Sequence, residues 1–443
     1  MQSNYLQTIQ RAAAVPTALC LLLHLSVPAA FGGQVLPFGN FHRAKDAEKR
    51  CDEFADPIPL IDPSTRGPGI DLSKMNVSQA LPACQQAAEL SQNPRYVGLY
   101  SVVLRFEGNF AEAIRQAEWA AARGNALAMM NLGELYANGQ GVSRNSAESA
   151  AWYRKAADTG NAFAMEKLAD HYVTGDGVPQ DGSVAASLYQ KSADQGIPPA
   201  MTGLGYLYEF GSGVPQDYSE AMAWYRKALN AGDSSTAANA MSRIAYLYLS
   251  GQGVTKDYSE AAAWYRKAAD GGDPSGMYGL GIIYQAGWGV PKNAADAASW
   301  YRKAIALSYD KAKLNLGVLY EYGWGVERDP NMALTLFTQA SQSPRRDVAA
   351  AGVRLSGLLR SRLQSSSPAQ TQNSAGYPSS TSADADKKVF AAAALTVLLV
   401  LAAASLNQSN SAPSYAGTEP EKQPGIGVGE GLILADAFGF FDD

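Results

Sequence analysis

Apolar residues recur through the middle of the chain in a nine-residue segment whose first, fifth and ninth positions are usually Ala, Leu and Tyr. Positions i, i+4 and i+8 lie on one side of an α-helix, so each segment predicts a helix with an apolar stripe. The six copies are AMMNLGELY from Ala128, AMEKLADHY from Ala164, AMTGLGYLY from Ala200, AMSRIAYLY from Ala240, GMYGLGIIY from Gly276 and AKLNLGVLY from Ala312. One helix cannot bury such a stripe alone, so the pattern indicates helices that stack on one another.

Each nine-residue segment is followed by a glycine turn and then by a second helical pattern. The turns are GQGV at Gly139, GDGV at Gly175, GSGV at Gly211, GQGV at Gly251, GWGV at Gly287 and GWGV at Gly323, spaced 36, 36, 40, 36 and 36 residues apart. The second pattern ends in WYRKA at Trp152, Trp224, Trp264 and Trp300, with the variants LYQKS at Leu188 and LFTQA at Leu336. We expect its Trp and Tyr to cover the first helix and the next repeat, and its Arg and Lys to face solvent. The predicted fold is an all-α, α/α superhelical solenoid of antiparallel helix pairs.

This 36-residue unit resembles the Sel-1-like repeat, a relative of the tetratricopeptide repeat, and the resemblance covers six repeats over residues 126–342. It implies antiparallel helix pairs in a right-handed superhelix that serves as a binding surface for other proteins. Residues 94–125 resemble a divergent tetratricopeptide-like hairpin. The cysteine-bounded stretch before them resembles modules that precede such repeats in exported bacterial proteins.

The first 30 residues have the pattern of a secretory signal peptide. A polar stretch that ends at Arg11 is followed by a largely apolar run to Ala30, with small residues at its end. A retained signal anchor is the alternative. Removal of the signal leaves two cysteines, Cys51 and Cys84, within an N-terminal module at 31–93 that is rich in proline. We expect them to form a disulfide in an exported protein, whereas two unpaired thiols would indicate a reducing compartment.

The part after the repeats divides into four segments by composition. We expect a C-terminal capping helix at 343–363, a flexible Ser- and Pro-rich linker at 364–388 and an acidic Gly-rich tail at 407–443. Between the last two, residues 389–406 form an uncharged apolar run near the minimum length of a transmembrane helix. A helix buried against the fold or a partner is the alternative.

Composition and motifs argue against catalysis and against nucleic-acid binding. The formal net charge is −5, without the basic excess of a nucleic-acid-binding domain. The chain has three histidines and three cysteines, too few to favour a metal site, and none of the HExxH, GxSxG or phosphate-loop motifs. We therefore expect no enzymatic activity, no cofactor and no metal.

The fourth and seventh positions of each nine-residue segment lie outside the apolar stripe and three residues apart, hence on one helix face. In the geometry that the resemblance implies, this helix lines the concave surface, which makes these positions the expected partner-binding residues. The expected set is Glu134, Lys167, Asp170, Tyr206, Arg243, Tyr246, Ile282 and Val318. The column is polar towards the amino terminus and apolar towards the carboxyl terminus, which suits an amphipathic or extended segment of a protein partner. Tyr206 and Tyr246 are the expected aromatic anchors.

Taken together, the sequence predicts a protein-interaction scaffold or adaptor in the periplasm or anchored to the inner membrane, with a role in signalling or envelope assembly. The first alternative is an endoplasmic-reticulum membrane adaptor of a protein-quality-control complex. The second is a hydrolase of cell-wall polymers, which the missing catalytic motifs disfavour.

Overall fold

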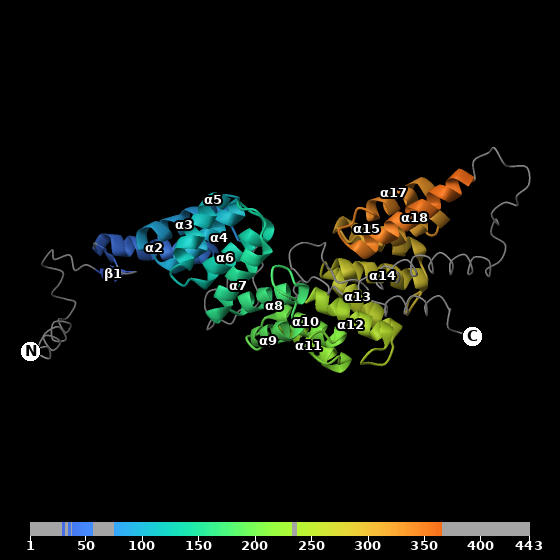
Figure 1. The fold of residues 1–443 in the computed structure, drawn as a ribbon, viewed down its shortest axis with the longest axis horizontal. Coiled ribbons are helices and arrows are strands. Elements are labelled where there is room, and N and C mark those ends of the chain that lie inside the picture. The colour runs from blue at the N-terminus through green and yellow to red at the C-terminus, as the bar shows by residue number, and fades with distance from the viewer. Residues whose placement is uncertain (1–28, 32–33, 37, 56–74, 233–236, 366–443) are drawn as a thin grey trace, which may run out of the picture. The chain divides into compact units, whose positions relative to one another are not determined.

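The computed structural model describes residues 29–31, 34–36, 38–55, 75–232 and 237–365. Within these residues the chain is a series of α-helices, and consecutive helices pack side by side within each of two compact units (Figure 1). A short antiparallel hairpin of β1 (Ala29–Phe31) and β2 (Gln34–Leu36) precedes them. The all-α solenoid fold that the repeat pattern predicts is confirmed. The expected signal peptide lies outside the described residues except for its last two alanines, and so do almost all of the linker and the whole transmembrane and tail segments.

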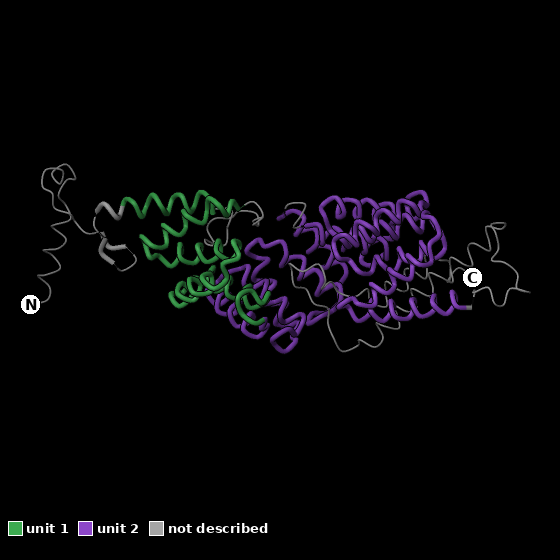
Figure 2. Tube along the Cα trace, turned by 90° about the horizontal axis from the view of Figure 1, so that it is seen from above, with its two compact units in different colours: residues 1–61, 70–143 green, residues 62–69, 144–443 purple. Residues whose placement is uncertain are grey.

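The helices fall into two compact units, divided between residues 143 and 144 (Figure 2). Unit 1 contains α2 (Phe38–Ala55), α3 (Val77–Ser91), α4 (Pro94–Glu107), α5 (Phe110–Ala121) and α6 (Ala126–Asn138). In this unit α2 packs on α3, α3 on α4, and α4 on α5. Cys51 of α2 and Cys84 of α3, the pair expected from the sequence, are joined by a disulfide.

Unit 2 consists of helix pairs that pack in series. Its helices are α7 (Ser146–Asp158), α8 (Ala162–Thr174), α9 (Gly182–Ala193), α10 (Pro198–Phe210), α11 (Tyr218–Ala231), α12 (Ala238–Ser250), α13 (Tyr258–Asp270), α14 (Pro274–Ala286), α15 (Ala294–Ala306), α16 (Lys311–Tyr322), α17 (Pro330–Ala340) and α18 (Arg346–Ser365). The nine-residue segments lie in the even-numbered helices from α6 to α16. The last helix, α18, packs on α17 and extends two residues beyond the expected capping helix.

The glycine turns reverse the chain as the sequence predicts, and the turn after α10 shows how. Gly211 ends α10 in the left-handed conformation with φ 66°, and Gly213 has φ 74°. A Cβ on Gly213 would lie 2.0 Å from the backbone of Gly182, so this position excludes every side chain. The Asp217 side chain then caps α11 by accepting hydrogen bonds from the N–H groups of Ser219 and Glu220. Helix ends are thus fixed by local chemistry in each repeat.

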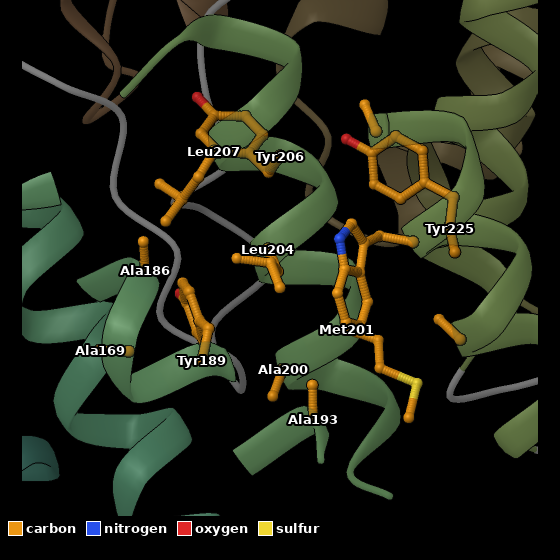
Figure 3. Close-up of a cluster of buried hydrophobic side chains, with 14 of the residues drawn as sticks. Ala169, Ala186, Tyr189, Ala193, Ala200, Met201, Leu204, Tyr206, Leu207 and Tyr225 are labelled. Atoms are coloured by element: carbon orange, nitrogen blue, oxygen red, sulfur yellow. The ribbon is translucent and has the colours of Figure 1, made fainter. Parts of the chain in front are cut away.

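The tyrosine of the second helix is the central core residue of the repeat. Tyr189 and Tyr225 are 1% and 0% exposed and lie on either side of Leu204 of α10 (Figure 3). Each ring fills space left by a glycine of α10, because a Cβ on Gly203 would lie 2.6 Å from Tyr189 and one on Gly205 would lie 2.6 Å from Tyr225. The small residues of the first helix therefore admit tyrosines from the second helices before and after it.

The second helix departs from the sequence-based expectation at its tryptophan and its arginine. Trp264 is only half-buried, and the Lys267 ammonium lies 4.0 Å from its ring centroid. Arg266 does not simply face solvent, because its Nη2 donates to the Tyr284 hydroxyl of the next repeat at 2.5 Å. In α13 Tyr265, at 7% exposed, is therefore buried more deeply than Trp264, and Arg266 links neighbouring repeats. The equivalent tryptophan of α11, Trp224, is 8% exposed and packs in the core.

Among the described helices, none is long and apolar enough to cross a membrane. The candidate span at 389–406 lies beyond them and remains a prediction.

Candidate protein-binding surface

Three residues in the last turns of α10 and one residue within α12 form a compact group, which we call the Arg243 cluster: Tyr206, Glu209, Phe210 and Arg243. The Arg243 guanidinium lies 5.4 Å from the Tyr206 ring centroid and 5.8 Å from that of Phe210. The centroids of the Tyr206 and Phe210 rings are 4.5 Å apart. Arg243 therefore covers a pair of aromatic rings on the neighbouring helix, an attractive arrangement for a cation.

The buried Glu209 carboxylate holds the Arg243 guanidinium in position. The Glu209 side chain is 1% exposed, against 15% for that of Arg243, and Arg243 Nη1 donates to Glu209 Oε1 at 3.4 Å. The other carboxylate oxygen accepts a hydrogen bond from the Tyr225 hydroxyl at 2.5 Å. Burial raises the pKa of Glu209, while Arg243 and the Tyr225 hydroxyl lower it. The carboxylate thus ties the surface cation to the repeat core.

Phe210 is the exposed member of the cluster. It is 43% exposed, whereas Tyr206 is 2% exposed and packs in the hydrophobic core of unit 2. The expectation that Tyr206 is an exposed anchor is therefore wrong, because the α10 backbone directs its ring under Phe210 and Arg243. The exposed aromatic lies four residues later on the same helix.

The other expected binding residues divide into buried and half-buried groups. Asp170 and Val318 are 7% and 5% exposed, so the expectation that their column faces solvent is wrong at these positions as well. The half-buried group consists of Glu134, Lys167, Tyr246 and Ile282. Tyr246 shares a helix face with Arg243, while Glu134 belongs to unit 1.

Asp170 belongs to a buried polar group that stabilises the junction of α8 and α9. It accepts a hydrogen bond from the Tyr189 hydroxyl at 2.5 Å. Burial raises the pKa of the Asp170 carboxyl well above its usual range, and the neighbouring Glu166 carboxylate raises it further. Lys167, whose Nζ lies 3.5 Å from Glu166, opposes this shift. The buried carboxyl groups of Glu166 and Asp170 therefore serve the core rather than a partner.

We expect Asp170 to make the folded chain less stable as the pH rises. Because its pKa is raised in the folded state, unfolding releases a proton, and stability falls from its usual pKa of about 4 up through the raised value. The variant Asp170→Asn keeps a hydrogen-bond acceptor for the Tyr189 hydroxyl but cannot ionise. Between about pH 5 and pH 8, the free energy of unfolding of this variant should therefore fall less than that of the wild type. Urea unfolding followed by circular dichroism measures both, with Asp158→Asn on the exposed side of α7 as the control. Parallel curves for the wild type and Asp170→Asn would contradict the assignment.

The described residues contain no group of three His, Cys, Asp or Glu side chains placed to hold a metal ion. Sequence reasoning missed Glu209 and Phe210, which follow the nine-residue segment directly. The available signal was an acid at the tenth position, where three other repeats have Ala137, Val173 and Leu249.

Comparisons with known proteins agree with this architecture. The family model described as Sel1 repeat matches residues 126–161, 162–197, 198–233, 238–273, 274–309 and 310–343. A Sel1 repeat protein from Oxalobacter formigenes is 30% identical over 56% of this chain and 98% of its own, with a TM-score of 0.51. A search of curated proteins found no match.

Two further solved structures are similar at lower identity. A protective antigen of uropathogenic Escherichia coli with an SLR fold is 23% identical, covers 77% of this chain and 84% of its own, and has a TM-score of 0.34. An immunity protein from Pseudomonas aeruginosa is 20% identical, covers 53% of this chain and 87% of its own, and has a TM-score of 0.34. The six matched repeats, together with the 30% identity to a Sel1 repeat protein matched over nearly its full length, show that the chain belongs to the Sel1 repeat proteins.

Proposed function

We propose that this protein is a non-enzymatic scaffold that binds a protein partner at the Arg243 cluster. Sel1 repeat proteins are generally protein-interaction scaffolds, and their fold is typically non-enzymatic. The observation that carries the proposal is Phe210, an aromatic side chain 43% exposed and held beside a cation that a buried carboxylate fixes. Aromatic and arginine side chains on a rigid support are the residue types that dominate binding energy at protein interfaces.

The chemistry around Phe210 favours an amphipathic or extended segment as the partner. Arg243 offers a partly exposed cation to an acidic or carbonyl group, and Tyr246, on the same face of α12, is half-buried. An apolar residue of the partner would pack on Phe210 while an acidic neighbour reached Arg243. Lys167 and Ile282, at equivalent helix faces in other repeats, extend the proposed surface.

The proposed place of action is the periplasm or cell envelope, in signalling or envelope assembly. Two features support it: the signal-like first 30 residues and the Cys51–Cys84 disulfide, a bond that persists in oxidising compartments. The apolar run at 389–406 is proposed to anchor the protein to the inner membrane.

The binding site can be tested by crosslinking from residue 210. We expect p-benzoylphenylalanine in place of Phe210 to give a discrete photo-adduct with a partner in native cells, because the side chain is exposed and similar in shape. The same group in place of Leu307, which is 40% exposed between α15 and α16, is the matched control and should not give that adduct. Identical adducts from both positions, or none from residue 210, would count against this surface.

Once the partner is identified, Phe210→Ala should weaken the binding of that partner by about 2 kcal/mol, the size expected of a central aromatic anchor. Because Phe210 is exposed, the melting temperature should change little. Isothermal titration calorimetry and thermal unfolding measure the two quantities. A large loss of stability in Phe210→Ala would show that the side chain supports the core instead.

A further inference from the structure

Unit 1 contains a cavity of about 960 Å³, and none of its lining residues belongs to the Arg243 cluster. Val97 and Tyr100, the buried lining residues of α4, form its floor, and the other lining residues belong to or adjoin α3 and α5, which both pack on α4. Its volume lies near the upper end of the range for ligand pockets. We call it the α3–α5 pocket, and it is large enough for a short peptide segment.

Helices α3 and α5 each contribute one carboxylate to the lining of the pocket. Glu89 of α3 is exposed and accepts a hydrogen bond from Gln85 at 2.9 Å. Glu112 of α5 accepts one from Arg115 Nε at 2.9 Å, so the single cation among the lining residues is paired with a residue of its own helix. Two carboxylates against one guanidinium leave the pocket with a net negative charge.

The floor provides a polar group that lacks a partner among the described residues. Tyr100 is 8% exposed and lines the pocket, and its hydroxyl makes no hydrogen bond with any residue that the structure describes. Burial raises the pKa of Tyr100, and the carboxylates of Glu112 and Glu89 raise it further, against the opposing effect of Arg115. The potential at the floor is therefore negative, which favours a cation and a hydrogen-bond donor.

The aromatic residues of the pocket argue against a sugar ring as the ligand. Trp119 of α5 lines the pocket, but the Arg123 guanidinium lies 3.7 Å from its ring centroid and covers one face. Tyr100 is too deeply buried to present an open face for stacking. The pocket thus offers charge and hydrogen-bond acceptors rather than an aromatic platform.

We propose that the α3–α5 pocket binds a lysine- or arginine-containing segment of a protein partner. A basic side chain lies between Glu89 and Glu112 and donates to the Tyr100 hydroxyl. This inference rests on the proposed function, since it gives the scaffold a second contact of defined chemistry in unit 1.

The test uses the full chain and a fluorescein-labelled peptide, Gly-Lys-Gly-Arg-Gly-Lys-Gly. A matched peptide carries norleucine and citrulline in place of lysine and arginine, which keeps the side-chain shapes without the charges. Fluorescence anisotropy should show at least tenfold tighter binding of the basic peptide. Equal binding of the two peptides would overturn the proposal, and this comparison requires no variant.

The double variant Glu89→Gln, Glu112→Gln locates the binding. We expect it to lose at least tenfold in affinity for the basic peptide, and Tyr100→Phe to lose a smaller factor. The matched control Glu53→Gln, Glu118→Gln removes two charges from exposed positions of unit 1 outside the pocket, and it should bind as the wild type does. Equal losses in the two double variants would overturn the pocket as the site, because they would reflect net charge alone.

Two further outcomes separate this inference from its alternatives. Binding of chitotetraose that Glu89→Gln, Glu112→Gln abolishes, without binding of the basic peptide, would identify a saccharide site and overturn the proposal. A partner adduct from residue 210 without peptide binding would leave the scaffold function intact and refute the pocket. Peptide binding without that adduct would support the pocket and refute the Arg243 cluster.

Discussion

Tyr225→Ala is expected to lower the free energy of unfolding of unit 2 by about 3–5 kcal/mol, the range for a large buried aromatic truncated to alanine. Tyr225 is 0% exposed, and its ring occupies the space that Gly205 leaves on α10. The substitution would open a cavity between α10 and α11 and would also remove the hydrogen bond to Glu209. Urea unfolding monitored by circular dichroism measures the loss.

Tyr225→Phe separates the ring from its hydroxyl. It keeps the packing against Gly205 but leaves a buried oxygen of Glu209 without its donor, which should cost about 1–3 kcal/mol. Trp264→Ala is the control from a second helix, because that side chain is half-buried and its removal should cost less than Tyr225→Ala. A larger loss in Trp264→Ala would mean that the tryptophan, not the tyrosine, holds neighbouring repeats together.

The fold could be predicted from the sequence because the same helix and turn signals occur in all six repeats. The Leu and Tyr stripe defines one helix, and the glycine turn at Gly211 and Gly213 is required by positive φ angles in the structure. The acid or amide that caps the second helix, such as Asp217, is visible as well. These features act over a few residues, so their physical consequences can be worked out without knowing the three-dimensional contacts.

The proposed binding surface was harder to predict, because helical periodicity shows which side of one helix a residue lies on but not which neighbouring side chains cover it. Tyr206 lies outside the Ala–Leu–Tyr stripe, yet Phe210 and Arg243 cover it. Arg243 comes from the next repeat, 34 residues after Glu209. Such a pairing depends on how two repeats stack, and the four-residue insertion between them changes the spacing that the other repeats follow.

The same limit applies to Arg266. Its place late in the second helix is typical of a cation that complements the helix dipole. The sequence does not show that the Tyr284 hydroxyl of the next repeat lies within reach of its guanidinium. A local rule therefore explains why an arginine is tolerated there, while the stacking of repeats decides what it bonds.

Removal of the disulfide by the double substitution Cys51→Ser, Cys84→Ser should destabilise unit 1 by about 3–4 kcal/mol. The two cysteines are 33 residues apart, and closing a loop of that length removes much of the freedom of the unfolded chain. The loss of stability should be largest in α2, which packs mainly on α3. Its Asp52 carboxylate also accepts hydrogen bonds from Arg95 and from the Tyr96 hydroxyl of α4.

Hydrogen exchange distinguishes this local effect from a general loss of stability. Amides of α2 should exchange much faster in the double variant, whereas those of α10 and α11 in unit 2 should keep their protection, because local openings follow the contacts of each element. Reduction of the wild type with dithiothreitol is the control. It should reproduce the faster exchange of α2 and leave the double variant unchanged. Unaltered protection of α2 in both the variant and the reduced protein would show that packing on α3, rather than the covalent bond, holds this helix in place.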